Sequence, residues 1–229
     1  MSTETGRNVS VATVTVSAAS VELEGDLAIP VGARGVVLFA HGSGSSRHSP
    51  RNRFVADVLQ DAGLATLLMD LLTMREEAID THTGHLRFDI DLLAERVVGA
   101  TDWLLSHPGT RGFRIGYFGA STGAAAALVA ATRRPDAVAA VVSRGGRPDL
   151  AGEALAAVQA PTLLIVGGDD TAVIDLNRQA MARMVARHRL EIVPGATHLF
   201  EEAGALEQVA RLAREWFCHY LDKAGRTNG

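Results

Sequence analysis

The sequence predicts an α/β fold of three layers, in which helices cover both faces of a mostly parallel, twisted sheet. The first observation is a set of short, continuous apolar runs, such as residues 36–40 and 161–166, which are typical of strands buried on both faces. The second observation is that stretches with helical spacing of apolar residues separate these runs from residue 36 onward. Strands that alternate with helices form βαβ units, and such units build a parallel sheet.

Each expected element has a local signal. The first two strands alternate apolar and polar residues, whereas the later strands are continuous apolar runs. Gly63 is a suitable end for the first helix, and Pro108 and Pro135 stop two later ones. The expected strands are residues 9–16, 21–29, 36–40, 64–68, 113–118, 138–142, 161–166 and 190–193. The expected helices are residues 50–62, 88–107, 124–134, 149–158, 175–188 and 205–221.

The composition fits one cytoplasmic domain over residues 1–229. The 229 residues are 47% hydrophobic, which is enough for a large core, and no linker or repeat divides them. A net charge of −4 without a basic cluster argues against nucleic-acid binding. Residues 1–7 lack the apolar core of a signal peptide, and the apolar runs are too short to span a bilayer, so we expect no membrane partner. We expect a monomer or a homodimer.

Residues 119–123 read G-A-S-T-G and lie between an expected strand and an Ala-rich expected helix. A serine at such a tight turn forms a nucleophile elbow, because flanking glycines let the backbone bend sharply and approach neighbouring chain closely. Ser121 is therefore predicted to be a nucleophile. The alternative is a small residue in an ordinary turn between a strand and a helix.

Further polar residues follow the ends of other expected parallel strands, at the edge where open α/β sheets bind ligands. They are Asp169, Asp170, His198 and the loop 41–45. A serine hydroxyl attacks an ester only when a base takes its proton, and His198 would be that base. One of the two aspartates would fix the tautomer of the histidine and stabilise its charged form.

Two backbone N–H groups are the expected donors to the oxyanion that forms when a carbonyl is attacked. One belongs to Thr122, directly after the expected nucleophile, and the other belongs to Ser43 in the first loop.

With these motifs, the chain resembles the α/β-hydrolase fold and, within it, the dienelactone hydrolase-like group. The resemblance covers nearly the whole chain through F-A-H-G-S-G, G-A-S-T-G, V-G-G-D-D and P-G-A-T-H-L-F, in this order. It implies that Asp170 is the acid of the triad, with Asp169 second and Asp175 third. It also implies that His41 orients the first loop. Dienelactone hydrolase itself has a cysteine at the elbow where this chain has Ser121, so its lactone substrate is not carried over.

Other residues are candidates for substrate contacts. His41 and Gly42 lie in the first loop, while Arg144 and Arg147 follow the strand 138–142 and so face the same edge of the sheet. Arginine binds carboxylate and phosphate groups in a bidentate manner, so one of these arginines would recognise such a group on the substrate. The alternative is that both are solvated loop residues.

Three further residues are given structural interpretations. His82 and His85 have a spacing that suits a metal, but no third ligand is apparent, and we expect neither a metal nor a cofactor. Cys218 lies on the apolar side of the last helix and is expected to be a thiol of the core. It is the single cysteine of the sequence, which excludes a disulfide within this chain.

The predicted function is a serine esterase that cleaves carboxylic esters of small molecules through an acyl-enzyme. A thioesterase, a lactonase or a perhydrolase would use the same residues, and a non-catalytic ligand-binding protein of the same fold is the alternative from another class. The charged stretch at about residues 71–88 is either a small cap over the site or a solvated connection. A cap of this size would not cover a long acyl chain, so we expect short or compact substrates.

Overall fold

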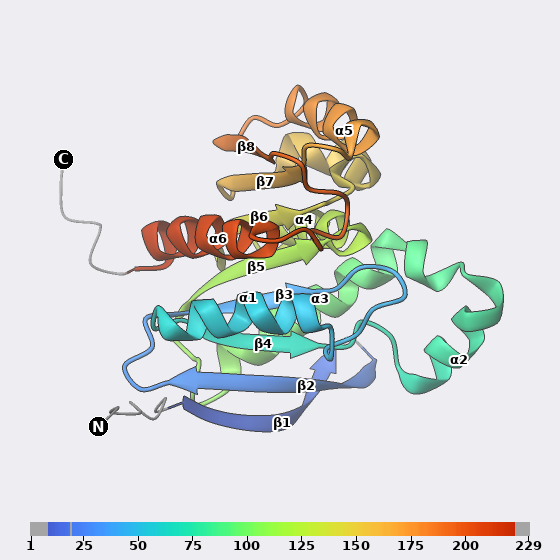
Figure 1. Ribbon diagram of the computed structural model, residues 1–229. Coiled ribbons are helices and arrows are strands. Elements are labelled where there is room, and N and C mark those ends of the chain that lie inside the picture. The colour runs from blue at the N-terminus through green and yellow to red at the C-terminus, as the bar shows by residue number, and fades with distance from the viewer. Residues whose placement is uncertain (1–8, 19, 223–229) are drawn as a thin grey trace.

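The computed structural model describes residues 9–18 and 20–222. These residues form one eight-stranded sheet with helices on both sides (Figure 1). The polar residues 1–7, on which the expectation about a signal peptide rests, and residues 223–229 of the expected domain lie outside the described residues.

The order of the strands in the sheet is β1-β2-β4-β3-β5-β6-β7-β8. β2 runs antiparallel to β1 and to β4, whereas all neighbours from β4 to β8 are parallel. The predicted fold class is therefore confirmed. The strands are β1 (Val9–Ala18), β2 (Val21–Pro30), β3 (Gly35–Ala40), β4 (Ala65–Met69), β5 (Arg114–Ala120), β6 (Val138–Arg144), β7 (Thr162–Gly167) and β8 (His188–Val193).

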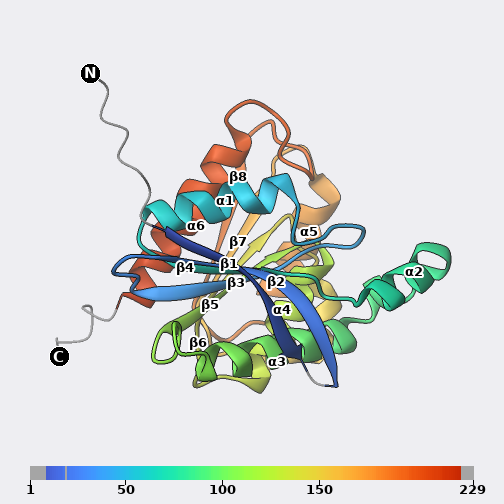
Figure 2. The ribbon, with the colours of Figure 1, turned by 90° about the horizontal axis from the view of Figure 1, so that it is seen from below.

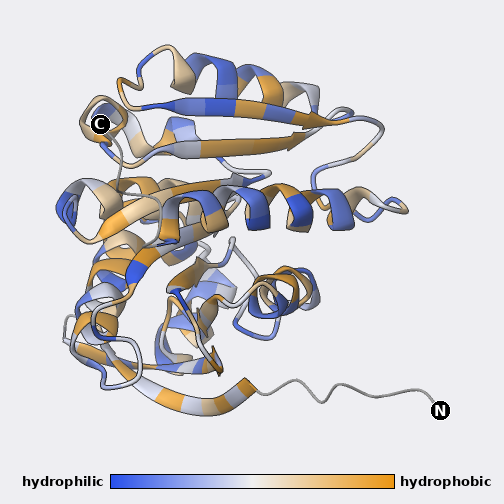
Figure 3. Cartoon of the chain, turned by 90° about the vertical axis from the view of Figure 1, so that its left-hand side faces the viewer, coloured by the Kyte–Doolittle hydropathy of each residue, from blue (hydrophilic) through white to orange (hydrophobic). Residues whose placement is uncertain are grey.

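Two helices, α1 and α6, cover one face of the sheet, and α3 and α4 cover the other (Figure 2). The helices carry alternating hydrophilic and hydrophobic bands, as expected where one side packs on a sheet (Figure 3). Within the part of the chain that the structure describes, no helix is long and apolar enough to cross a membrane. The helices are α1 (Pro50–Asp61), α2 (Met74–Thr83), α3 (Ile90–Ser106), α4 (Thr122–Arg133), α5 (Thr171–Met181) and α6 (Ala205–Leu221), with short 3₁₀ helices η1 (Leu86–Phe88) and η2 (Pro148–Ala157).

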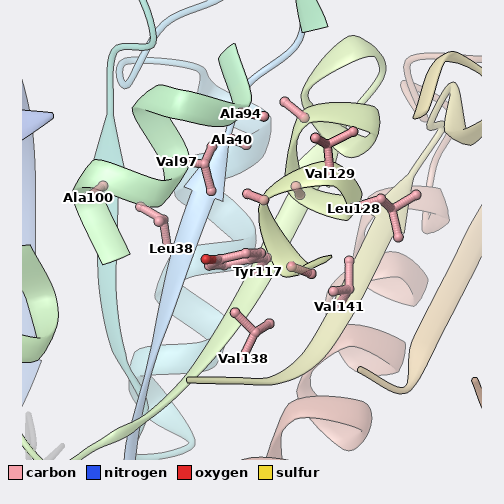
Figure 4. Close-up of a cluster of buried hydrophobic side chains, with 14 of the residues drawn as sticks. Leu38, Ala40, Ala94, Val97, Ala100, Tyr117, Leu128, Val129, Val138 and Val141 are labelled. Atoms are coloured by element: carbon pink, nitrogen blue, oxygen red, sulfur yellow. The ribbon is translucent and has the colours of Figure 1, made fainter. Parts of the chain in front are cut away.

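The core on the α3–α4 side surrounds a tyrosine in the central strand β5. Tyr117 is fully buried among aliphatic side chains such as Leu38 and Val97 (Figure 4). Its hydroxyl shares a 2.5 Å hydrogen bond with the Thr101 hydroxyl, so the single polar atom of the ring has a partner. Burial raises the pKa of Tyr117, which keeps the phenol neutral.

Three expected elements differ in the structure. The stretch 71–88 contains the helix α2, although it shows no apolar periodicity. The expected helix 149–158 is a 3₁₀ segment, interrupted where Gly152 adopts a φ of 54°. The expected helix 175–188 is wrong at both ends: α5 begins at Thr171, and β8 already begins at His188 because His188 pairs with Thr162 of β7. Sheet pairing prevails there over the helical spacing of the sequence.

Candidate active site

The turn between β5 and α4 has the geometry of a nucleophile elbow. Ser121 has a φ of 49°, a conformation that costs a non-glycine residue about 1–3 kcal/mol. The two glycines beside it are required by close packing. A Cβ on Gly119 would lie 2.4 Å from Cα of Ala124, and a Cβ on Gly123 would lie 2.2 Å from the carbonyl oxygen of Ala40. The pattern G-x-S-x-G is therefore dictated by the approach of α4 to β5 and β3.

The backbone of neighbouring chain segments fixes this strained turn. The Ser121 N–H donates to the carbonyl of Arg144 at the end of β6 (3.3 Å). The Ser121 carbonyl accepts hydrogen bonds from the N–H groups of Ala124 and Arg147, both at 3.1 Å. These three bonds hold the serine between β5, α4 and the end of β6, in the position that the sequence predicts.

His198 and Asp170 form a hydrogen-bonded pair. His198 lies in the loop after β8, and Asp170 lies between β7 and α5. The distance from His198 Nδ1 to Asp170 Oδ2 is 2.7 Å. An ionised carboxylate only accepts hydrogen bonds, so Nδ1 carries the proton and Nε2 of a neutral ring is left to accept one. This is the tautomer that a general base needs.

The structure also separates the alternatives to Asp170. The neighbouring Asp169 is exposed, and its backbone N–H donates to the carbonyl of Ala196. Asp175 is exposed on α5 and pairs with Arg178. Of the three aspartates considered, Asp170 is the one whose carboxylate contacts His198.

Ser121 and His198 line one cavity of about 230 Å³ at the carboxyl ends of the strands. No hydrogen bond joins their side chains in this structure, and such bonds are often long in enzymes without substrate. The other residues that line the cavity are Gly42, Ser43, Ser45, Ser49, Arg51, Ala120, Arg144 and Leu199. The volume lies below the range of about 300–1,000 Å³ that is common for drug-sized ligands, so the cavity suits a small substrate.

The two expected oxyanion donors lie next to each other. Thr122 is buried at the start of α4, where helix geometry leaves backbone N–H groups without partners inside the helix. The Ser43 N–H donates to the Thr122 hydroxyl at 3.0 Å, which ties the first loop to this helix end. An oxyanion would have to share the Ser43 N–H with Thr122 or take it over.

His41 joins the first loop to the stretch that follows β4. Its Nε2 accepts a hydrogen bond from the Leu71 N–H (3.0 Å), and its Nδ1 donates to the Gly42 carbonyl (2.9 Å). One ring nitrogen accepts and the other donates, so the imidazole must be neutral. Burial lowers the pKa of His41, although the charges of Asp70 and Glu77 oppose this shift.

The pH dependence of stability should report on this neutral imidazole. Because the pKa of His41 is lower in the folded protein than its ordinary value of 6.5, the unfolded chain binds more protons as the pH falls below that value. The contribution of His41 is therefore complete above pH 6.5 and is lost towards acid pH, at up to about 1.4 kcal/mol per pH unit. Melting temperatures of the wild type and His41→Gln, measured from pH 8 to pH 5, should converge at acid pH. Parallel curves would contradict the prediction.

Residues 71–88, which we call the cap segment, contain the helix α2, and more than half of these residues are exposed. Helix α2 starts with a reciprocal capping box, in which Thr73 and Glu76 each bind the backbone N–H of the other. Asp80 is buried and accepts hydrogen bonds from the Leu86 N–H (2.7 Å) and from Arg87 Nε (2.5 Å). The sequence signal that could have revealed α2 is the pair of Thr73 and Glu76 followed by Gly84, which ends the helix at a φ of 66°.

The cap segment lies against the first loop. A small cavity of about 30 Å³ separates the loop 41–45 from Glu77, Asp80 and Arg87 of the cap segment. Helix α2 projects from the body of the molecule beyond the end of α3 (Figures 1 and 2). None of the residues that line the cavity around Ser121 belongs to the cap segment, so in this structure the cap segment supports the first loop and leaves the cavity uncovered.

The two arginines after β6 have different surroundings. Arg144 is buried and lines the cavity with Ser121 and His198. Arg147 forms a bidentate ion pair with Asp149, at 2.9 and 2.7 Å, and does not line this cavity. Arg51, at the start of α1, lines the cavity but was not among the residues expected from the sequence.

The remaining candidates have local roles in the described structure. His82 Nδ1 contacts the Ala78 carbonyl, and His85 Nδ1 contacts the Thr83 hydroxyl. Among residues 9–18 and 20–222, no group of three or more His, Cys, Asp or Glu residues is placed to hold a metal ion. Cys218 packs, partly buried, against the cluster on the α6 side, and burial raises the pKa of its thiol.

Comparison with known proteins gives relatives of two kinds. The crystal structure of dienelactone hydrolase from Anabaena variabilis has 64% identical residues and a TM-score of 0.92, and the match covers 93% of this chain and 99% of that one. Two proteins of Mycobacterium tuberculosis, each named "Putative phosphoribosyl transferase", are 58% identical over 208 residues. That match covers 91% of this chain but 46% of theirs, so the chain spans about half the length of these relatives.

More distant structures share the fold. Est1E from Butyrivibrio proteoclasticus has 15% identity and a TM-score of 0.75, with 90% of this chain and 97% of that chain covered. The family model described as "Dienelactone hydrolase family" matches residues 23–221, a range that includes the elbow serine, the Asp170–His198 pair and the first loop. By this match and by its identity to the Anabaena protein over nearly the full length of both, the chain belongs to the dienelactone hydrolase family.

Proposed function

We propose that the protein is a serine hydrolase that cleaves carboxylic esters of small molecules through an acyl-enzyme. The observation that carries the proposal is the 2.7 Å bond from His198 to Asp170 beside a cavity that also contains Ser121. This bond sets the tautomer of His198, and the strained φ of Ser121 presents its hydroxyl at the end of the sheet. Membership in the dienelactone hydrolase family supports hydrolysis as the reaction class.

In the proposed mechanism, Ser121 Oγ attacks the carbonyl carbon of the ester while His198 Nε2 takes the hydroxyl proton. Asp170 stabilises the resulting imidazolium. The N–H groups of Thr122 and Ser43 donate to the negative oxygen. His198 then gives its proton to the departing alcohol, which leaves an acyl group on Ser121. Water, activated by the same histidine, releases the acid and restores the serine.

The substrates that we propose are short or compact, because the cavity holds about 230 Å³. Thioesters, lactones and peroxide as a second substrate are compatible with the same three residues. The name of the M. tuberculosis relatives refers to proteins about twice as long as this chain, and the proposal concerns the portion that is shared with them.

A fluorophosphonate tests whether the serine is activated. We expect one covalent adduct per chain by intact mass, located on Ser121 by peptide mass analysis. The Ser121→Ala variant and heat-denatured wild type should remain unlabelled, because an unactivated hydroxyl reacts slowly. A folded wild type that remains unlabelled would contradict the proposal and would favour a non-catalytic, ligand-binding role for the same cavity.

A further inference from the structure

The cavity around Ser121 contains a buried cation that has no anionic partner. Arg144 is only 7% exposed, and no carboxylate of the described residues lies within ion-pair distance of it. Among the described residues, the one hydrogen bond of its guanidinium is a long contact of 3.4 Å from a terminal nitrogen to the Asn52 side chain. Its Nε is buried without any hydrogen-bond partner. The guanidinium also lies 5.9 Å from the centre of the Phe200 ring, a weak stabilising contact.

This arrangement is energetically unfavourable. A buried charge normally has an opposite charge and a full set of hydrogen bonds, because desolvation is costly. Burial, followed by the nearby charge of Arg51, lowers the pKa of Arg144 to about 10. The group therefore still carries its charge at neutral pH. An anion in the cavity would provide the compensation that the protein itself does not supply.

A second cation faces the same cavity. Arg51 lies in the first turn of α1, and its Nε is also buried without a hydrogen-bond partner. Its ion pair with Glu201, at 3.2 Å, involves a carboxylate that is 64% exposed, and such pairs contribute little. The first turn of α1 contains no acidic residue, so the positive end of the helix dipole adds to the field of both arginines.

Arg147 provides the contrast within the same loop. Its guanidinium is already paired with both oxygens of Asp149, which raises the pKa of Arg147. The protein thus neutralises one arginine after β6 with its own carboxylate and leaves the other one, beside Ser121, uncompensated. This difference separates the two candidates that the sequence alone left equivalent.

We propose that the substrate hydrolysed at Ser121 carries a carboxylate or phosphate group, which the guanidinium groups of Arg144 and Arg51 bind in the cavity that both residues line. The inference rests on the proposed function, since it names the substrate class of the same site. The bound anion is unchanged by the reaction: it positions the ester, while water adds across the acyl–oxygen bond elsewhere in the molecule.

The first test compares anionic and neutral esters on each enzyme variant. Mono-4-nitrophenyl glutarate is paired with 4-nitrophenyl valerate, and 4-acetoxyphenyl phosphate is paired with phenyl acetate. For Arg144→Gln we expect the kcat/KM of an anionic ester to fall about 10–100-fold more than that of its neutral match, the effect of losing a charge-assisted hydrogen bond. Arg51→Gln should show the same selective loss at a smaller size, because Arg51 is less buried.

The design separates specific binding from general effects. Each value is the ratio of kcat/KM for the anionic ester to that for the neutral ester on one preparation, so the folded fraction cancels. The intrinsic reactivities of the two esters cancel when the ratio of a variant is divided by that of the wild type. Arg178 is exposed on α5, and Arg178→Gln removes one positive charge just as Arg144→Gln does. This control variant should leave the ratio unchanged. If the selective loss of kcat/KM is larger for the glutarate ester, the recognised group is a carboxylate; if it is larger for the phosphate ester, the recognised group is a phosphate. Equal losses on anionic and neutral esters, or a selective loss in Arg147→Gln in place of Arg144→Gln, would overturn the proposal.

The second test does not require catalysis. Glutarate and inorganic phosphate are titrated calorimetrically into the Ser121→Ala protein, and we expect saturable binding of at least one of them that is lost in Ser121→Ala/Arg144→Gln. Binding without any esterase activity in the wild type would refute the proposed function but retain the anion site. Ester hydrolysis with no charge preference and no anion binding would refute the anion site and retain the function.

Discussion

The Asp170→Asn variant should lose about 10⁴-fold in kcat on any ester that the wild type hydrolyses. The Asp170 carboxylate accepts a hydrogen bond from the protonated Nδ1 of His198 at 2.7 Å and so keeps Nε2 free for the Ser121 proton. An asparagine amide can instead donate to Nδ1, which moves the ring proton to Nε2 and removes the base. The measurement is steady-state hydrolysis of 4-nitrophenyl acetate, with circular dichroism to show that the variant is folded.

Asp169→Asn is the matched control, because the same chemical change is made one residue away. Asp169 is exposed, and its contact to the loop of His198 is made by its backbone N–H, which the substitution preserves. Its kcat should stay within about threefold of the wild type, since surface substitutions usually have small effects. A larger loss in Asp169→Asn than in Asp170→Asn would refute the assignment of the acid.

The second large effect is expected for Gly123→Ala at the elbow. The added Cβ would lie 2.2 Å from the Ala40 carbonyl oxygen and 2.4 Å from that of His41, so α4 or the end of β3 must move. We expect a decrease of about 3 kcal/mol in the free energy of unfolding, the upper end for overpacking of a core. For a chain of this length, this lowers the melting temperature by about 6–12 °C.

Gly32→Ala separates this steric effect from the loss of glycine as such. Gly32 lies in the turn after β2 with a φ of 73°, and a Cβ there would meet nothing within 4 Å. Gly32→Ala should lower the free energy of unfolding by about 1–2 kcal/mol, because an alanine is strained in the left-handed backbone conformation. Thermal denaturation of both variants gives the comparison. If Gly123→Ala melts no lower than Gly32→Ala, the close approach of α4 to β3 is not the reason that position 123 requires a glycine.

The sequence predicts the fold class because buried parallel strands leave continuous apolar runs. It predicts the first two strands, which are antiparallel, from their alternation of apolar and polar residues. It misses α2, since a helix that projects from the body has no apolar face to bury and is fixed by capping and by Asp80. It also misplaces α5, because the pairing of His188 with Thr162 depends on a neighbouring strand that local spacing does not reveal.

At the site, the motifs predict which strand ends meet but not which side chains face each other. Asp169 and Asp170 are adjacent and chemically identical, and the turn after β7 decides which one contacts His198. Arg144 and Arg147 differ in their charge compensation, because Asp149 pairs with Arg147 and not with Arg144. Arg51 gives almost no signal, because it reaches the cavity only through the packing of α1 on the sheet. Such pairings are properties of tertiary geometry, whereas the catalytic motifs are local.

The hydrogen bonds of His41 make the first loop and the cap segment thermodynamically linked. One neutral ring accepts a hydrogen bond from the N–H of Leu71, the first residue of the cap segment, and donates to the carbonyl of Gly42, next to Ser43, the proposed oxyanion donor. Displacing the cap segment therefore breaks a bond that the loop depends on, and the reverse holds with the same free energy. A molecule that binds α2 more tightly when the cap segment is displaced would consequently change the affinity of the site for a transition-state analogue, and the analogue would change the affinity for that molecule by the same factor.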